Sequence, residues 1–425
     1  MTTYISAEVV EYYFKNPSQI VFEVTENCNM ACSYCTFGDL YNHNDNRGAN
    51  GLKRMTKENV DIVLGYYFDI WDNTNSSVKD IYISFYGGEP LMNISLIKYI
   101  VNKIEVASTE SEHKFYNRNF IYSLTTNGLL LGKHIEFFVE NNFSLLISLD
   151  GDKEGNSYRV LKASGESSFE IVMRTINEIK EQYPDYFEQS VSFNSVLHNK
   201  NSLNGLIDFF SEHVGKRPTF NTINPAMLSA SHKEAFKTMN IDVNQLIIDR
   251  IQMGDSFLDD YFYTIPIIKS AIVEIFNNSG NVFKSFNNLL FPPKTNKKEM
   301  PTGTCIPFSK KIFISARGLV LPCERISHQY AQGIVKEEEI KIDFQAISDK
   351  FNECYNDIEN QCKTCAQRRN CLKCVLSDNS FLQKRCESYK KYSGDFVGDN
   401  NNTFLTLLLK RPDIYQKIIT ETTYY

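Results

Sequence analysis

Runs of hydrophobic residues typical of strands and runs typical of helices take turns between residue 20 and about residue 225. IVFEVT at 20–25 reads as a buried strand, and Thr56 is placed to cap a helix with apolar residues at helical spacing. Further strands are expected at 80–88, 120–128, 143–151, 191–197 and 219–224, and helices at 95–107, 134–142, 168–183 and 203–213. Six such alternations predict an α/β fold with a parallel sheet, either doubly wound or a partial barrel.

The second half of the chain shows a different pattern. Residues 229–290 carry helical periodicity, and the polar, lysine-rich stretch 292–304 marks a domain boundary. Segment 310–325 has the alternation and central glycine of a hairpin, and the short, cysteine-dense remainder is expected to owe its order more to bound metal than to a core. The predicted parts are an N-terminal segment 1–19, a core 20–228, a helical extension and linker 229–300, a cysteine-rich domain 301–390 and a helical tail 391–425.

Composition narrows the cellular setting. Hydrophobic residues make up 42% of the chain and charged residues 23%, no apolar run approaches the roughly 20 residues that cross a bilayer, and the N-terminus does not resemble a signal peptide. We therefore expect a cytoplasmic protein with no membrane contact. A net charge of -6 argues against binding to nucleic acid.

The cysteines are unevenly placed. Of the 11, three fall between residues 28 and 35, and the other eight fall between 305 and 386. An odd number in a chain without a secretion signal speaks against a disulfide framework, and clustered thiols in a reducing compartment more often bind metal.

The first cysteine group follows the first expected strand directly. Cys28, Cys32 and Cys35 are spaced Cys-x3-Cys-x2-Cys, and three thiolates can hold three irons of a [4Fe-4S] cluster while the fourth iron stays open. With the aromatic Tyr34 before the third cysteine, this motif resembles that of radical S-adenosylmethionine (SAM) enzymes. The resemblance implies an enzyme whose cluster cleaves SAM to a 5'-deoxyadenosyl radical that abstracts hydrogen from a substrate. A zinc site or three incidental thiols is the alternative.

A glycine motif ends the second expected strand. Gly87, Gly88, Glu89 and Pro90 resemble the GGEP segment of the same family, whose backbone meets the SAM amino group. Glycines permit that close approach of the backbone. An ordinary turn is the alternative interpretation.

Polar residues at the ends of the later strands complete the expected SAM site. The resemblance implies contacts with SAM from Thr126, Asn127, Ser148, Asp150 and Asn194. Arg159 lies where similar enzymes often carry an arginine near the SAM carboxylate or the substrate, and a guanidinium can bind a carboxylate with two hydrogen bonds. A surface arginine on a helix is the alternative for Arg159.

The second cysteine group resembles the SPASM extension of radical SAM proteins. The resemblance implies a partial (β/α)6 barrel of the TIM type followed by a small iron-sulfur domain with two auxiliary [4Fe-4S] clusters. The first would be bound by Cys305, Cys323 and Cys374, and the second by Cys362, Cys365, Cys371 and Cys386. The total would be three clusters and SAM. A zinc module is the alternative, although five residues between the paired cysteines is a short spacing for two zinc sites.

Two features of this group depart from the family pattern. Two residues separate Cys371 from Cys374, where the family has three. The first auxiliary cluster also has three evident ligands, so either Cys354 is the fourth or one iron is open to a substrate thiolate.

These resemblances suggest a peptide as the substrate. Our leading hypothesis is a maturase that forms a thioether or carbon-carbon crosslink in a ribosomally made peptide. The alternative is an anaerobic sulfatase-maturating enzyme, which oxidises Cys or Ser to formylglycine. That family has an aspartate after the cysteine matching Cys323, and this chain has Glu324. Glu324 is a candidate base, with a surface residue as the favoured interpretation.

Several partners follow from the leading hypothesis. Only 27 residues precede Cys28, too few for a leader-binding domain, so a separate leader-binding protein is a candidate partner. The precursor peptide and an electron donor such as flavodoxin or ferredoxin are the others. The identity of the peptide and the type of bond formed stay open.

Overall fold

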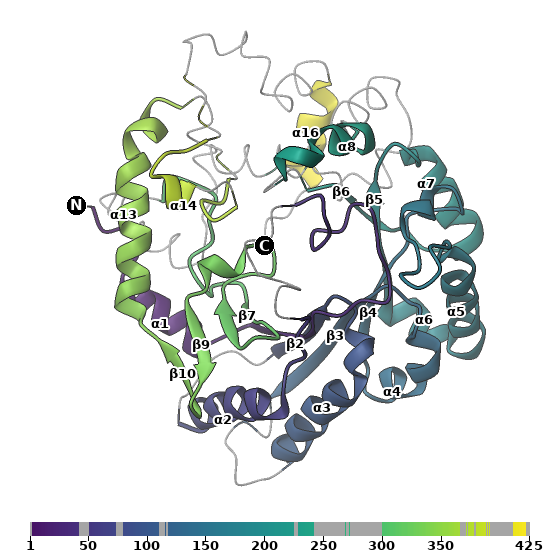
Figure 1. Ribbon diagram of the computed structural model, residues 1–425, viewed down its shortest axis with the longest axis horizontal. Helices are drawn as coiled ribbons and strands as arrows, with labels where there is room; N and C mark the ends of the chain where they lie inside the picture. The colour runs from purple at the N-terminus through teal and green to yellow at the C-terminus, as the bar shows by residue number, and fades with distance from the viewer. Residues whose placement is uncertain are drawn as a thin grey trace.

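The fold was analysed in a computed structural model of the chain. The described residues are 2–41, 51–73, 80–109, 115, 118–224, 228–241, 268, 272, 300–365, 371, 373–377, 380–387, 389, 391 and 411–421. They form an α/β structure in which helices cover the outside of one curved sheet (Figure 1).

The described strands form one ten-stranded sheet in the order β10-β9-β8-β7-β1-β2-β3-β4-β5-β6. The bounds are β1 Gln19–Thr25, β2 Asp80–Gly87, β3 Asn119–Thr126, β4 Ser144–Ser148, β5 Val191–Leu197, β6 Thr219–Thr222, β7 Ile312–Ile314, β8 Leu319–Leu321, β9 Gly333–Lys336 and β10 Glu339–Ile342. Strands β1 to β6 are parallel and follow each other without reversal. That order is the order of a barrel and not of a doubly wound sheet, so the predicted fold class is confirmed.

Helices occupy the segments between the strands. The bounds are α1 Ala7–Lys15, α2 Lys57–Asn73, α3 Ile94–Thr109, α4 Ile135–Glu140, α5 Phe169–Gln182, α6 Pro184–Ser190, α7 Leu203–Phe209, α8 Lys233–Met239, α13 Phe344–Lys363, α14 Ser380–Gln383 and α16 Pro412–Glu421. Thr56 caps α2, since its Oγ1 accepts from the Asn59 amide at 3.3 Å. Among the described helices, none is both long and apolar enough to span a membrane. Of the expected helical extension, α8 and residues 268 and 272 are described, and the rest lies outside the described residues.

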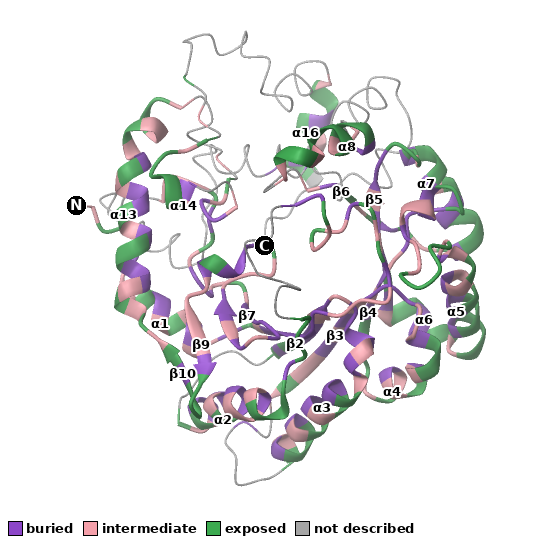
Figure 2. Cartoon of the chain, in the orientation of Figure 1, coloured by how far each residue is buried: buried purple, intermediate pink, exposed green. Residues whose placement is uncertain are grey.

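The two faces of the parallel sheet differ in burial. In β3, Tyr122 and Leu124 are buried, while Ile121 and Ser123 on the opposite face are half-buried, and the same alternation runs through β5. Hydroxyl contacts cross the second face, where Ser84 Oγ lies 2.6 Å from Ser123 Oγ. Figure 2 shows the buried positions of the helices turned towards the sheet. The concave inner face is therefore partly polar and partly accessible.

The cysteine-rich region joins the same sheet. The predicted hairpin is present as β7 and β8, with Gly318 at φ 78° in its turn, and β7 pairs in parallel with β1. Helix α13 also packs into the main hydrophobic core, where Phe351, Tyr355 and Ile358 are fully buried. The expectation that metal more than a core orders this region is therefore wrong for α13. The domain boundaries given above stay predictions.

The N-terminal segment is held against α13, beside α1 (Figure 1). Asn352 Oδ1 accepts from the amides of Tyr4 and Ile5 at 2.8 and 3.0 Å, while its Nδ2 donates to the Ile5 carbonyl at 2.7 Å. Asn356 binds the Thr2 amide and carbonyl in the same way, both at 2.9 Å. The side-chain amides of α13 thus satisfy backbone N–H and C=O groups of this segment, as a neighbouring strand would do in a sheet.

Candidate functional site

The first cysteine group lies in the loop that follows β1. The Cys35 amide donates to the Cys32 carbonyl at 3.1 Å, and the Met30 amide donates to Cys28 Sγ at 3.4 Å. Cys28 interacts electrostatically with Cys32, and Cys32 does so with Cys35. The loop therefore turns back on itself, and electrostatic interactions link its three thiols. Their binding of one cluster stays a prediction.

The surroundings of these thiols can be compared with the needs of an iron-sulfur cluster. Burial raises the pKa of Cys28 and of Cys32 to about 11, so these thiols ionise readily only beside a cation, which iron supplies. Within the described ranges, no three His, Cys, Asp or Glu side chains are arranged to hold a single metal ion. Clustered soft thiol ligands suit iron and sulfide, so the donor set fits the predicted cluster.

The glycines of the GGEP segment meet the cysteine loop. A Cβ on Gly87 would lie 2.2 Å from the Thr25 carbonyl oxygen, and a Cβ on Gly88 would lie 2.4 Å from that of Asn27. The Gly88 and Glu89 amides donate to the same two carbonyls at 2.9 and 2.8 Å. These glycines are thus required by the packing of the cysteine loop on the end of β2. Their predicted contact with SAM stays a prediction.

Glu89 connects the ends of β2 and β3 inside the protein. Its carboxylate accepts from the Leu91 amide at 3.1 Å, from Thr126 Oγ1 at 2.8 Å and from the Asn127 amide at 2.8 Å. Burial raises the pKa of Glu89 to about 7, against the effect of these donors. Pro90 follows at the first position of a short helix. Glu89 therefore holds its neighbours in place and does not face an open site.

Asn127 reaches back to the cysteine loop. Its Nδ2 donates to Asn29 Oδ1 at 2.8 Å and lies 3.9 Å from Cys28 Sγ, and its Oδ1 accepts from the Leu129 amide at 3.1 Å. The structure thus brings Thr126 and Asn127 to the first cysteine group, as their positions at a strand end predicted.

Asp150 and Arg159 form a buried ion pair behind the cysteine loop. Arg159 donates to Asp150 from Nε at 2.9 Å and from Nη2 at 3.3 Å, and the Tyr34 hydroxyl donates to the same carboxylate. Burial alone would raise the pKa of Asp150, but the adjacent guanidinium and these donors outweigh it and hold that pKa below its usual range. Arg159 also lies beside Cys32. It is buried and not a surface residue, and the carboxylate that it meets is Asp150.

Ser148 and Asn194 are register partners on β4 and β5. Both are half-buried on the concave face, and Asn194 Oδ1 accepts from the Asn221 side chain on β6. These two predicted SAM residues therefore lie side by side on neighbouring strands, with side chains on the accessible face.

His198 is a member of this region that the sequence reading missed. It is fully buried, with Nε2 3.8 Å from Asp150 Oδ2 and its ring centroid 5.7 Å from that of Tyr34 and 4.8 Å from that of Tyr158. A single histidine one residue beyond a strand gives no distinguishing signal in one sequence.

The predicted ligands of the first auxiliary cluster are partly brought together. The Val375 amide donates to Thr304 Oγ1 at 3.0 Å, which places the neighbours of these residues, Cys374 and Cys305, on adjacent segments. Cys323 follows β8, and its Sγ accepts from the Arg325 amide at 3.3 Å.

Cys354 differs from these cysteines in its surroundings. It is buried on α13 within the main hydrophobic core. Its role as a fourth ligand stays a prediction.

The predicted ligands of the second auxiliary cluster gather at the end of α13. The Cys365 amide donates to the Cys362 carbonyl at 3.3 Å, and the Cys386 amide donates to Gln361 Oε1 at 2.9 Å. Cys371 is half-buried. These contacts place the backbones of Cys362, Cys365 and Cys386 near the end of α13. Their binding of a cluster stays a prediction.

Glu324 is not at the surface, contrary to the favoured interpretation. Its side chain is 16% exposed and forms an ion pair with Lys311 at 3.2 Å. Tyr86 on β2 interacts electrostatically with both Glu324 and Cys35. Glu324 thus lies at the sheet edge that carries the first cysteine group, because β7 and β8 are paired next to β1.

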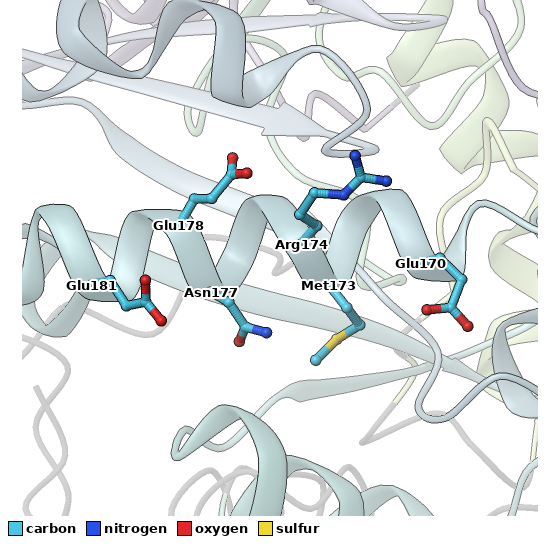
Figure 3. Close-up of a pocket in the computed structure, with 6 residues that line it drawn as sticks. All are labelled: Glu170, Met173, Arg174, Asn177, Glu178 and Glu181. Carbon is cyan, nitrogen blue, oxygen red and sulfur yellow. The ribbon is translucent and has the colours of Figure 1, made fainter.

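A surface hollow of about 470 Å³ lies elsewhere, along helix α5 (Figure 3). Its lining residues are Glu170, Met173, Arg174, Asn177, Glu178 and Glu181. All six come from α5, and none is a predicted site residue, so this hollow is not part of the candidate site.

Residues 22–211 match the family described as the Radical SAM superfamily. With the fold and the cysteine loop described above, this match identifies residues 22–211 as a radical SAM domain.

Three curated proteins are similar in sequence to the chain. A cysteine-type anaerobic sulfatase-maturating enzyme of Clostridium novyi is 29% identical over 40% of this chain and 42% of its own length. The radical SAM cyclopropyl synthase TigE of Paramaledivibacter caminithermalis is 21% identical over 83% of this chain and 64% of its own. A cysteine-type anaerobic sulfatase-maturating enzyme of Clostridium perfringens is 23% identical over 88% and 95%. The chain thus spans less than two thirds of the first two relatives.

Solved structures agree on the fold. The structure of native anSMEcpe with bound AdoMet and the Kp18Cys peptide superposes with a TM-score of 0.61 at 16% identity, covering 94% of this chain and 99% of that one. The likeness at this identity concerns the fold alone.

Proposed function

We propose that this enzyme uses radical SAM chemistry to install a thioether or carbon-carbon crosslink in a ribosomally made peptide. The observation that carries the proposal is the pairing of β7 with β1, which joins the second cysteine group to the sheet edge of the first. Both groups can then act on one substrate. Similarity to TigE, whose name describes the synthesis of a cyclopropyl group, supports bond formation on carbon.

The residues of the first site have distinct parts in this proposal. When bound, the cluster and SAM supply a 5'-deoxyadenosyl radical that removes one hydrogen atom from the peptide. Cys28, Cys32 and Cys35 hold three irons, and Ser148 and Asn194 orient SAM on the concave face. These two side chains are suited to this because they are polar, adjacent and accessible.

Formation of the crosslink also removes a second hydrogen from the peptide. This hydrogen leaves as a proton and an electron. Glu324 is our candidate for the base that accepts the proton, because it is a half-buried carboxylate beside Cys323, on the sheet edge that carries Cys35. The electron requires an acceptor other than the first site. Auxiliary clusters on the second cysteine group, which its resemblance to the SPASM extension implies, would supply such an acceptor.

The second candidate function is the oxidation of a cysteine or serine to formylglycine in a sulfatase. It is favoured by the alignment over 95% of the length of the Clostridium perfringens enzyme. The ion pair of Glu324 with Lys311 also favours it, because it keeps a carboxylate at the position where that family has an aspartate.

Mass spectrometry separates the two functions. The enzyme, purified without oxygen and with iron, is incubated with SAM, a reductant and either a peptide encoded beside its gene or a sulfatase peptide containing cysteine. We expect 5'-deoxyadenosine and a peptide that has lost two hydrogen atoms. An aldehyde in place of the cysteine would replace our first candidate by the second. No 5'-deoxyadenosine from fully iron-loaded enzyme would overturn both, and Cys32→Ala serves as the inactive control.

A further inference from the structure

A second buried ion pair connects the two cysteine-bearing parts of the molecule. Arg317, in the turn between β7 and β8, donates from Nε to Glu26 Oε1 at 2.6 Å and from Nη2 to Oε2 at 3.0 Å. The Glu26 side chain is fully buried, and that of Arg317 is 18% exposed. Two parallel hydrogen bonds from one guanidinium fix both the distance and the orientation of the groups they join.

Glu26 also binds a third segment of the chain. Its Oε2 accepts from the Lys53 amide at 2.9 Å, and its own amide donates to the Lys53 carbonyl at 2.8 Å. Three residues earlier, Glu23 Oε2 accepts from the Ala316 amide at 2.9 Å. The turn at 316–317 is therefore held by two glutamates from the end of β1.

Each partner of this ion pair lies a few residues before a predicted cluster ligand. Glu26 stands two residues before Cys28, and Arg317 stands six residues before Cys323, with β8 between. Paired apolar side chains would stabilise such a buried contact at least as well, because removing two charges from water is costly. The presence of an ion pair with two hydrogen bonds here therefore indicates that the two segments must be held in one defined geometry.

We propose that Glu26 and Arg317 are positioning residues that hold the loop of the first cysteine group at a fixed separation and orientation from Cys323. The proposal rests on the proposed function, in which both cysteine groups act on one substrate. If the two parts shift against each other, SAM is still cleaved, but the substrate radical is no longer placed for its second oxidation. The radical then takes up an electron from the reductant and a proton from water, which returns the unmodified peptide, and 5'-deoxyadenosine accumulates without product.

The test compares the wild type with Arg317→Lys, which keeps the charge and loses the fork. Arg317→Lys is expected to retain its iron and its rate of SAM cleavage within about twofold, and to form about tenfold more 5'-deoxyadenosine per modified peptide, since small misplacements cost this much or more. Arg411→Lys is the matched control, because Arg411 also binds a carboxylate, that of Asp413, with Nε at 2.8 Å, and lies 25 residues beyond Cys386, the last cysteine of the chain. An unchanged ratio in fully loaded Arg317→Lys overturns the proposal.

A second measurement decides the matter if the variant loses iron. Cysteines that no longer hold iron react with iodoacetamide, and mass spectrometry maps them in the purified enzyme without any peptide substrate. We expect Cys28, Cys32, Cys35 and Cys323 to become reactive together in Arg317→Lys and Glu26→Gln, while Cys362 and Cys386 stay protected. Equal labelling of all these cysteines would show a general structural role and overturn the proposal.

Different results would contradict the proposed function and the positioning role of Glu26 and Arg317. A wild type that cleaves SAM but modifies none of the peptides contradicts the proposed function. The electron paramagnetic resonance spectrum of the SAM-bound cluster still decides on the pair, because the proposal expects it to change in Arg317→Lys and not in Arg411→Lys. An unchanged spectrum in iron-loaded Arg317→Lys would overturn it.

Discussion

Arg159 donates from Nε to Asp150 Oδ2 at 2.9 Å, and the Tyr34 hydroxyl donates to the same carboxylate. Asp150→Asn leaves the Arg159 charge buried without its partner. We expect the free energy of unfolding to fall by about 3–5 kcal/mol, measured by urea denaturation. The control is Glu234→Gln, which removes an exposed partner of Lys237 and should change this energy by less than about 0.5 kcal/mol. Equal effects of the two substitutions would contradict the buried pair.

Gly88 is expected to tolerate no side chain. In Gly88→Ala the new Cβ would meet the Asn27 carbonyl oxygen at 2.4 Å, so the cysteine loop must move away from β2. We expect iron at the first site and 5'-deoxyadenosine formation to fall by about tenfold or more. Gly65→Ala on α2 is the control: apart from its chain neighbours and the backbone of its own helix, no atom of the described residues lies within 4 Å of its Cβ, and a helical alanine should stabilise by about 0.5–1 kcal/mol. Full iron binding by Gly88→Ala would sink this prediction.

Glu89 should make stability depend on pH. Burial raises its pKa from 4.5 to about 7, so between these values the folded state holds a proton that the unfolded state has released. Its stabilising contribution is therefore present at low pH and is lost as the pH rises through about 7. The thermal midpoint of the wild type should fall relative to that of Glu89→Gln between pH 5 and pH 8. A constant difference between the two proteins would show that Glu89 does not titrate in this range.

Asn352 should control the order of the N-terminal segment. Asn352→Ala removes its hydrogen bonds to the Tyr4 and Ile5 backbone. Each lost bond is worth about 1 kcal/mol, so hydrogen exchange at the Tyr4 and Ile5 amides should speed up by about fivefold. Gln345→Ala is the control on the same helix, because the exposed Gln345 side chain donates a hydrogen bond to Asp349 of α13 and not to the N-terminal segment described here. Unchanged exchange in Asn352→Ala would mean that other contacts hold the segment.

Local pattern was sufficient for most of the parallel sheet. The strand observed at Val191–Leu197 is the one expected, and the first cysteine group lies in the loop directly after β1, as its place in the sequence indicates. Both features depend on residues near each other in the chain, where the alternation of apolar positions and the reach of a short loop decide the structure.

Helix α13 was missed although its signal is present. Asp343 caps it by accepting from the Ala346 amide at 2.9 Å, and Ile347, Phe351, Tyr355 and Ile358 recur at helical spacing. The cysteines at its end drew the interpretation towards a metal-ordered segment. Here the periodicity of the apolar residues was the better guide.

Contacts between distant residues were beyond a single sequence. Arg159 was expected to lie near the SAM carboxylate or the substrate, and in the structure it forms an ion pair with Asp150. The pairing of Glu26 with Arg317 joins residues far apart in the chain. Charge identifies groups that need partners, but which groups meet depends on how the strands are ordered in space.

The pairing of β7 with β1 has a consequence for synthesis of the protein. β1 is made early, yet one of its two neighbours, Ile312–Ile314, leaves the ribosome only after most of the chain. Until then one side of β1 presents unpaired amides and carbonyls, which invite pairing with other chains. Premature termination or truncation ahead of Ile312 should therefore yield an aggregating product and not a smaller working barrel.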